Sequence, residues 1–213
     1  MKKGDFIWGA ILLLAVFIII SPFTKDAFIA FTTSYPYLGG FLKFALLATM
    51  GEMLAVRIRS GKWVKLSGLG YRAFIWGFIG VVITLIFVIF ATGVEGAMEK
   101  NYLPGLHSPF LSAFFISTIM NIIFAPTMMG FHKLTDSYID LKFGQKTKVV
   151  KLEQVINHVD WYGFIHFVLF KTIPLFWIPA HTITFLLPPE YRVVVAALLS
   201  VALGILLAIP KKK

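Results

Sequence analysis

Long apolar runs separated by short polar segments make up most of the chain. A helix needs about 20 largely apolar residues to span a membrane. Six runs approach this length, at residues 6–23, 37–56, 73–94, 110–131, 163–187 and 193–209. The pattern therefore predicts an all-α fold. We expect a polytopic membrane helical bundle with about six transmembrane helices, forming a single transmembrane domain over residues 1–213.

The first run has the outline of a signal peptide, because the short basic start "MKK" precedes it. The sequence that follows it, "SPFTKDAF", is a poor cleavage site, so we interpret residues 6–23 as a retained helix. An Arg- and Ser-rich transit peptide is also absent. Both observations favour a prokaryotic plasma membrane over the membrane of an organelle.

The composition agrees with a membrane protein. Hydrophobic residues make up 58% of the chain, and the mean hydropathy is +0.84, more than a soluble domain of this size could bury. The formal net charge of +10 would suggest nucleic acid in a soluble protein. Here the charges lie between apolar runs, so we expect the lipid bilayer as partner and no nucleic acid. The lack of cysteine excludes disulfides and a thiol nucleophile.

Basic residues gather at alternate ends of the runs, which predicts an orientation. On one side would lie Lys2, Lys3, Arg57, Arg59, Lys62, Lys65, Arg72, Lys133, Lys142, Lys146, Lys148, Lys151 and Lys211–Lys213. On the other would lie Lys25, Asp26, Glu95, Glu99, Lys100, Glu190 and Arg192. The positive-inside rule then predicts that both termini are cytoplasmic, which agrees with an even number of spans.

Residues 147–160, between the fourth and fifth runs, predict an amphipathic helix. Its apolar stripe consists of Val149, Leu152, Val155, Ile156 and Val159. This pattern is typical of an interfacial helix on the inner leaflet, with a surface linker helix as the alternative.

Polar residues inside the apolar runs are the candidates for function, because a charge at the bilayer centre costs at least ~3 kcal/mol. The candidates for lining a solute pathway are Glu52, Asn121, Lys171, His181 and Thr184. Structural alternatives stay open for three of them. Glu52 could pair with a nearby arginine, Asn121 could bond across helices, and Lys171 could pair with an acid.

Prolines interrupt the fifth run. Pro174 and Pro179 each remove a backbone donor and free a carbonyl one turn earlier, and in a membrane that carbonyl needs another partner. The sequence therefore predicts a broken helix, which is either a kinked packing helix or the wall of a water-filled cavity. We group Pro126 and Trp177 with these prolines as helix-shaping residues, and we expect Arg192 to anchor the outer ends of the last two helices.

Small residues recur every fourth position along the last run. They are Ala196, Ser200, Gly204 and Ala208, and they predict a ridge for close helix packing. This ridge could pack inside one chain or join two copies in a homo-oligomer.

Signs of an enzyme are weak. His132, Asp136 and Asp140 share one helical face and could bind a metal or relay a proton, although a polar helix end is the more ordinary explanation. The chain has no GxSxG, no HExxH and no Gly-rich phosphate loop. We therefore expect no catalytic residues, no resident metal and no cofactor.

Several motifs together resemble the Mpv17/PMP22 family of small membrane proteins. The family's "GD" helix corresponds to Gly51-Glu52, and its later "DQ…FAP" motif corresponds to "MNIIFAP", with Met120 and Asn121 in place of Asp and Gln. The final signature, "WP..Q..NF..VP...R", is similar to "FWIPAHTITFLLPPEYR". The likeness covers residues 35–207, so residues 6–23 would be an added N-terminal helix.

The resemblance implies a multi-span helical protein that acts as a channel for small solutes. Our leading expectation is therefore a pore for a small-molecule or ion solute. A non-transporting membrane scaffold with a sealed helical bundle is the alternative. A third and weaker reading is an intramembrane enzyme that uses His132, Asp136 and Asp140.

Overall fold

The computed structural model describes residues 2–208 and the side chains of residues 2–206. These residues form helices joined by turns and short loops, and no β-strand occurs among them. The expected all-α fold is therefore confirmed. The expected end of the sixth helix at Ile209 and the basic residues Lys211–Lys213 lie outside the described residues.

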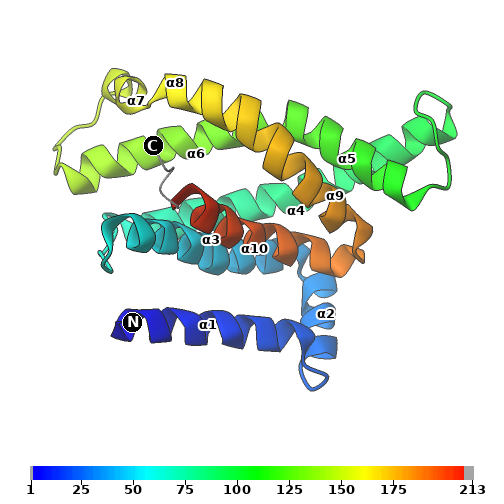
Figure 1. Cartoon of the computed structure of the whole chain (residues 1–213), viewed down its shortest axis with the longest axis horizontal. Coiled ribbons are helices and arrows are strands. Elements are labelled where there is room, and N and C mark those ends of the chain that lie inside the picture. The colour runs from blue at the N-terminus through cyan, green and yellow to red at the C-terminus, as the bar shows by residue number, and fades with distance from the viewer. Residues whose placement is uncertain (1, 209–213) are drawn as a thin grey trace. The chain divides into compact units, whose positions relative to one another are not determined.

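Two compact units make up the fold, and Figure 1 labels their helices. Unit 1 contains the chain up to Leu66, residues 76–84 and the chain from Val193. Unit 2 contains residues 67–75 and 85–192. The long helix α4 (Leu69–Glu99) contributes its middle to unit 1 and its two ends to unit 2.

Within the described residues, four helical segments are long and apolar enough to cross a membrane, as expected of a membrane protein. They are Lys3–Ile20, Leu69–Glu99, Trp161–Leu186 and Pro189–Leu206. A fifth is obtained if Pro109–Ile123 and Ala125–Gly144, which meet at a bend of 45°, count as one span. The run at 37–56 folds as α3 (Pro36–Ser60), which is long enough at 25 residues but is not one of these candidate spans. Six spans are therefore not confirmed.

Unit 1 contains a helix that the apolar pattern did not predict. This helix, α2 (Lys25–Ser34), follows α1 (Lys3–Ile20) and packs against α3, and Figure 1 shows it joining the two longer helices. The Lys43 amine of α3 donates to Thr32 at 2.8 Å and lies 4.8 Å from the centre of the Phe28 ring. Both partners belong to α2, which therefore provides the local environment of this lysine.

The start of α1 is attached to the end of α3. Asp5 accepts hydrogen bonds from Arg57 Nε at 2.9 Å and from Trp63 Nε1 at 2.8 Å. Trp8 Nε1 donates to the Met50 carbonyl at 3.1 Å. Most apolar side chains of α1 are exposed beyond these contacts, as expected of a helix that is surrounded by lipid.

Glycines allow the backbones of unit 1 to approach each other closely. A Cβ atom built at Gly40 would lie 2.7 Å from the Gly80 carbonyl oxygen of α4. A Cβ atom built at Gly204, in α10 (Pro189–Ala208), would lie 2.7 Å from the Gly51 oxygen of α3. The ridge predicted on the last helix therefore packs against α3 within the chain, through Ser200 and Gly204. The side chain of Ala208 lies outside the described part.

In unit 2, the expected fourth helix is two helices. α5 (Pro109–Ile123) ends at Phe124, and α6 (Ala125–Ile139) begins directly after it. Pro126 lies in the first turn of α6, where a missing N–H is tolerated. A short π-helix, η1 (Asp140–Gly144), continues α6.

The expected break in the fifth helix is wrong, because the helix is continuous from Trp161 to Leu186. A single turn, α8 (Trp161–Gly163), leads into a long π-helix, η2 (Phe164–Trp177), which contains Pro174. The backbone returns to α-helical geometry in α9 (Ile178–Leu186). Pro179 then lies in the first turn of α9. The chain accommodates its two prolines by changing hydrogen-bond spacing.

The segment 147–160 is helical over only half of its length. α7 (Leu152–His158) begins five residues later than expected. Val155 and Val159 of the predicted stripe are buried, whereas Val149, Leu152 and Ile156 are exposed. The stripe therefore does not form one continuous face.

Candidate functional site

Helix geometry explains why polar side chains meet between α5 and the fifth helix. Ser117 and Asn121 are four residues apart and therefore share one face of α5. Trp177, His181 and Thr184 have the i, i+4, i+7 spacing that places them on one face at the end of η2 and along α9. The helices α5 and α9 pack against each other. We name these five residues the polar seam.

Hydrogen bonds join the two sides of the polar seam. Asn121 Nδ2 lies 3.0 Å from His181 Nδ1 and donates to the Ser117 carbonyl at 2.8 Å. Ser117 Oγ donates to the Ile178 carbonyl at 2.7 Å. When the Asn121 amide is the donor, His181 Nδ1 is the acceptor and the imidazole proton is on Nε2.

Burial removes the polar seam from solvent. Asn121 is 1% exposed and Thr184 is 0% exposed, and the Thr184 hydroxyl donates back to the Ala180 carbonyl at 2.9 Å. The Trp177 ring stacks on His181 at a centroid distance of 5.1 Å, and Phe87 contacts the same imidazole edge-on at 5.8 Å. Aromatic rings therefore hold the imidazole on two sides.

One polar group of the seam has no partner within the described residues. Trp177 Nε1 is buried and forms no hydrogen bond, and the side chain is only 8% exposed. Thr118 Oγ1, one position after Ser117 on α5, is also buried without a partner. A buried donor of this kind costs about 1–3 kcal/mol, and such groups are few in native proteins. A third buried group without a partner, Thr49 Oγ1, lies in unit 1.

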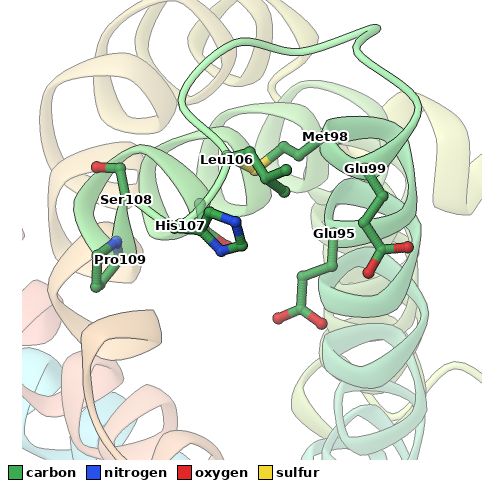
Figure 2. Close-up of a pocket in the computed structure, with 8 residues that line it drawn as sticks. Glu95, Met98, Glu99, Leu106, His107, Ser108 and Pro109 are labelled. Carbon is green, nitrogen blue, oxygen red and sulfur yellow. The ribbon is translucent and has the colours of Figure 1, made fainter.

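A pocket of about 360 Å³ opens where α4 ends and α5 begins. Figure 2 shows the Glu95 and Glu99 carboxylates of α4 and the His107 ring directed into the same space. Pro109 and Ser112 of α5 form part of its wall. At 1.5 Å per residue, Asn121 lies about 14 Å further along α5 than Ser112. The pocket therefore lies at the start of α5, and the polar seam lies further along the same helix.

Arg192, the expected outer anchor, lies beside the acidic residues of this region. Its Nε donates to the Leu187 carbonyl at 2.9 Å, and its guanidinium lies 5.5 Å from the centre of the Phe185 ring. Glu95 and Glu190 are close enough to interact with it electrostatically. Arg192 is thus within electrostatic range of Glu95, one of the carboxylates that line the pocket.

A second charged cluster lies at the other end of α4. Arg72 is only 6% exposed and forms ion pairs with both Asp136, at 3.0 Å, and Asp140. It also donates to the Ser67 carbonyl at 3.0 Å. His132 Nδ1 lies 3.4 Å from Asp136. The face that the sequence offered as a metal or proton-relay site thus places both carboxylates against a buried guanidinium.

The other sequence candidates lie outside the polar seam. Lys171 is on an exposed side of η2. Glu52 belongs to unit 1, where it accepts a hydrogen bond from Trp76 Nε1 at 3.2 Å. Among the predicted pathway residues, the structure therefore brings together Asn121, His181 and Thr184.

Sequence reasoning missed Ser117 and Phe87, and it assigned Trp177 only a helix-shaping role. The spacing of four residues between Ser117 and Asn121 was the available signal for the hydroxyl. No comparable signal exists for Phe87, because it lies on α4, far from the seam in sequence. Comparison with known proteins finds no matching family, no matching curated protein and no matching solved structure.

Proposed function

We propose that this chain is a membrane channel for small polar solutes, of the Mpv17/PMP22 type. The proposed pathway in unit 2 enters at the pocket near Glu95 and continues along α5 to the polar seam. Ser112, Ser117 and Asn121 provide polar groups at successive depths of α5. In the closed conformation, the contact between Asn121 and His181 would seal this pathway.

The unpaired indole N–H of Trp177 is the observation that carries this proposal. A sealed helical bundle is expected to satisfy its buried polar groups, because an unsatisfied donor in a membrane costs several kcal/mol. A donor kept unpaired next to His181 offers a hydrogen bond to an oxygen atom of a passing solute. The unpaired N–H therefore favours a solute pathway through the polar seam over a seam that only holds the helices together.

The pocket favours cationic and neutral solutes over anions. Two carboxylates on neighbouring turns of one helix create a negative potential, which concentrates cations at an entrance. Glu95 and Glu99 have this arrangement, and both are exposed. The selectivity expected from them is weak, because exposed charges are screened by salt.

The membrane arrangement belongs to the same proposal. We place this chain in a prokaryotic plasma membrane with six spans, with α3 as the least apolar of them and with both termini in the cytoplasm. The alternating basic segments support this orientation. Residues 35–207 would form the part similar to the Mpv17/PMP22 family.

A non-transporting scaffold is the second candidate. The observation in its favour is that Ser117 and Asn121 of α5 both have hydrogen-bond partners on α9, the Ile178 carbonyl and His181 Nδ1. Such bonds are an ordinary way to hold membrane helices together. In this case the seam would contribute stability and conduct nothing.

Solute flux into liposomes separates the two functions. Purified full-length chain is compared with protein-free liposomes for cations, anions and small neutral metabolites. Trp177→Phe keeps the ring and removes the unpaired N–H, so the channel proposal expects a severalfold change in flux. Trp161→Phe is the matched control, because Trp161 lies outside the seam and donates to the Ile156 carbonyl. Flux equal to that of empty liposomes for every solute would favour the scaffold.

A further inference from the structure

The segment between η1 and α7 has a defined conformation although it contains no helix. We name residues 145–151, "QKTKVVK", the lysine loop. The Gln145 and Thr147 amides donate to the carbonyls of residues 140 and 141, at 2.9 and 3.1 Å. Lys142 Nζ donates to the Lys148 carbonyl at 2.6 Å. The loop is therefore fixed at its start and in its middle.

Apolar and basic side chains alternate on the exposed surface of the lysine loop. Val149 is 75% exposed, and Leu152, the first residue of α7, is 70% exposed. Lys146, Lys148 and Lys151 are exposed around them, and residues 141–152 contain no acidic side chain. Exposed valine and leucine surrounded by lysines is a pattern found where proteins contact an anionic membrane surface.

The lysine loop lies in sequence between the ends of two candidate membrane spans. The bent pair of helices ends at Gly144, and the next candidate span begins at Trp161. If both segments span the membrane, residues 145–160 connect the point where the chain leaves the bilayer to the point where it re-enters. Tyr162 is 77% exposed at the start of that second span, as expected of an aromatic residue at the interface.

We propose that the lysine loop binds the anionic phospholipid headgroups of the leaflet that it faces. Lys146, Lys148 and Lys151 contact the phosphates, while Val149 and Leu152 insert between the headgroups. This differs from the amphipathic helix expected from the sequence. Two members of that apolar stripe, Val155 and Val159, are buried within the protein, so the lipid contact moves to the loop before α7.

The absence of cysteine in the chain makes a site-specific reporter straightforward. Full-length Val149→Cys is labelled with an environment-sensitive fluorophore and placed in bilayers of phosphatidylcholine, with or without phosphatidylglycerol. We expect a blue shift of the emission that grows with the phosphatidylglycerol fraction and is reversed by high salt. Tyr102→Cys is the control, because Tyr102 is 80% exposed in the loop between α4 and α5, and its label should not respond to phosphatidylglycerol.

Charge variants test the role of the lysines. Lys148→Gln with Lys151→Gln, in the labelled protein, should raise the phosphatidylglycerol fraction needed for the half-maximal shift by at least about fivefold. Lys25→Gln with Lys100→Gln removes the same charge elsewhere and should leave that fraction unchanged. All these residues are exposed, so the variants should keep the helix content of the parent chain.

Emission that is identical with and without phosphatidylglycerol, or a shift that is unaffected by Lys148→Gln and Lys151→Gln, would overturn the proposal. A label that remains water-exposed in every bilayer would also overturn it and would indicate a protein partner instead.

Discussion

At the scale of single residues, the ion pairs of Arg72 have the clearest energetic consequence. A buried guanidinium that faces two carboxylates leaves an uncompensated charge when one partner is removed. Arg72 is nearly fully buried, while Asp140 is about half exposed. Most of the interaction energy therefore belongs to the pair of Arg72 and Asp136.

Arg72→Met should destabilise the fold by up to about 3–5 kcal/mol, because it leaves Asp136, whose side chain is only 25% exposed, without its cation. Arg72→Lys keeps the positive charge, but an ammonium group lacks the planar set of donors with which the guanidinium contacts both carboxylates. The loss of stability should therefore be smaller than for Arg72→Met. Thermal unfolding in detergent, followed by circular dichroism, measures both. The double variant of Arg72→Met and Asp136→Asn should lose less stability than the sum of the single variants. Full additivity would show that the two side chains act independently.

The sequence predicted three members of the polar seam one by one, but not their pairing. Asn121, His181 and Thr184 were recognisable because polar side chains inside apolar runs are costly. The contact between Asn121 and His181 joins positions 60 residues apart, and one sequence contains no direct information on such a distance. The same limit applies to Arg72, whose partners follow it by 64 and 68 residues.

At the scale of helices, the close contact between Gly80 of α4 and Gly40 of α3 leads to a prediction about stability. Gly80→Ala would place a methyl group onto the Gly40 carbonyl and the Phe44 side chain. The helices would have to separate, and we expect a loss of about 1–3 kcal/mol in unfolding free energy. Thermal unfolding of the purified protein in detergent measures this loss.

Gly93→Ala is a matched control on the same helix, because nothing lies within 4 Å of a Cβ atom at Gly93. Alanine has the higher helix propensity, so this change should be neutral or stabilise by up to about 1 kcal/mol. Equal effects of the two substitutions would contradict the close contact between α3 and α4.

The apolar runs predicted where most of the helices lie along the chain. They did not predict whether the backbone of each helix is α-helical or π-helical. The run at 163–187 differs by only one or two residues from the helical segment Trp161–Leu186. Its long π-helix was not predictable, because a proline shows that one hydrogen bond is missing but not how the neighbouring backbone adjusts. α2 was missed because its 10 residues are too few to produce a spanning run.

At the scale of the whole molecule, α3 decides the membrane arrangement. The structure supports four or five spans, and the proposed orientation needs α3 as a sixth. Its four charged side chains need not exclude it, because small residues at Gly40 and Gly51 allow it to pack closely against α4 and α10. A helix surrounded by other helices can span a membrane with a lower hydropathy than one that faces lipid.

Cysteine labelling tests this arrangement without background, since the native chain has no cysteine. Lys25 and Lys62 are both exposed, and only α2 and α3 separate them. α2 is about 15 Å long and cannot cross a bilayer. If α3 spans the membrane, a membrane-impermeant thiol reagent added to intact cells should label Lys25→Cys and spare Lys62→Cys. In permeabilised cells the reagent should label both.

Labelling of both positions in intact cells, or of neither, would place the two positions on one side of the membrane and exclude α3 as a span. The alternation of basic loops would then lose its explanation, because the segment 57–65 would no longer share a side with the N-terminus.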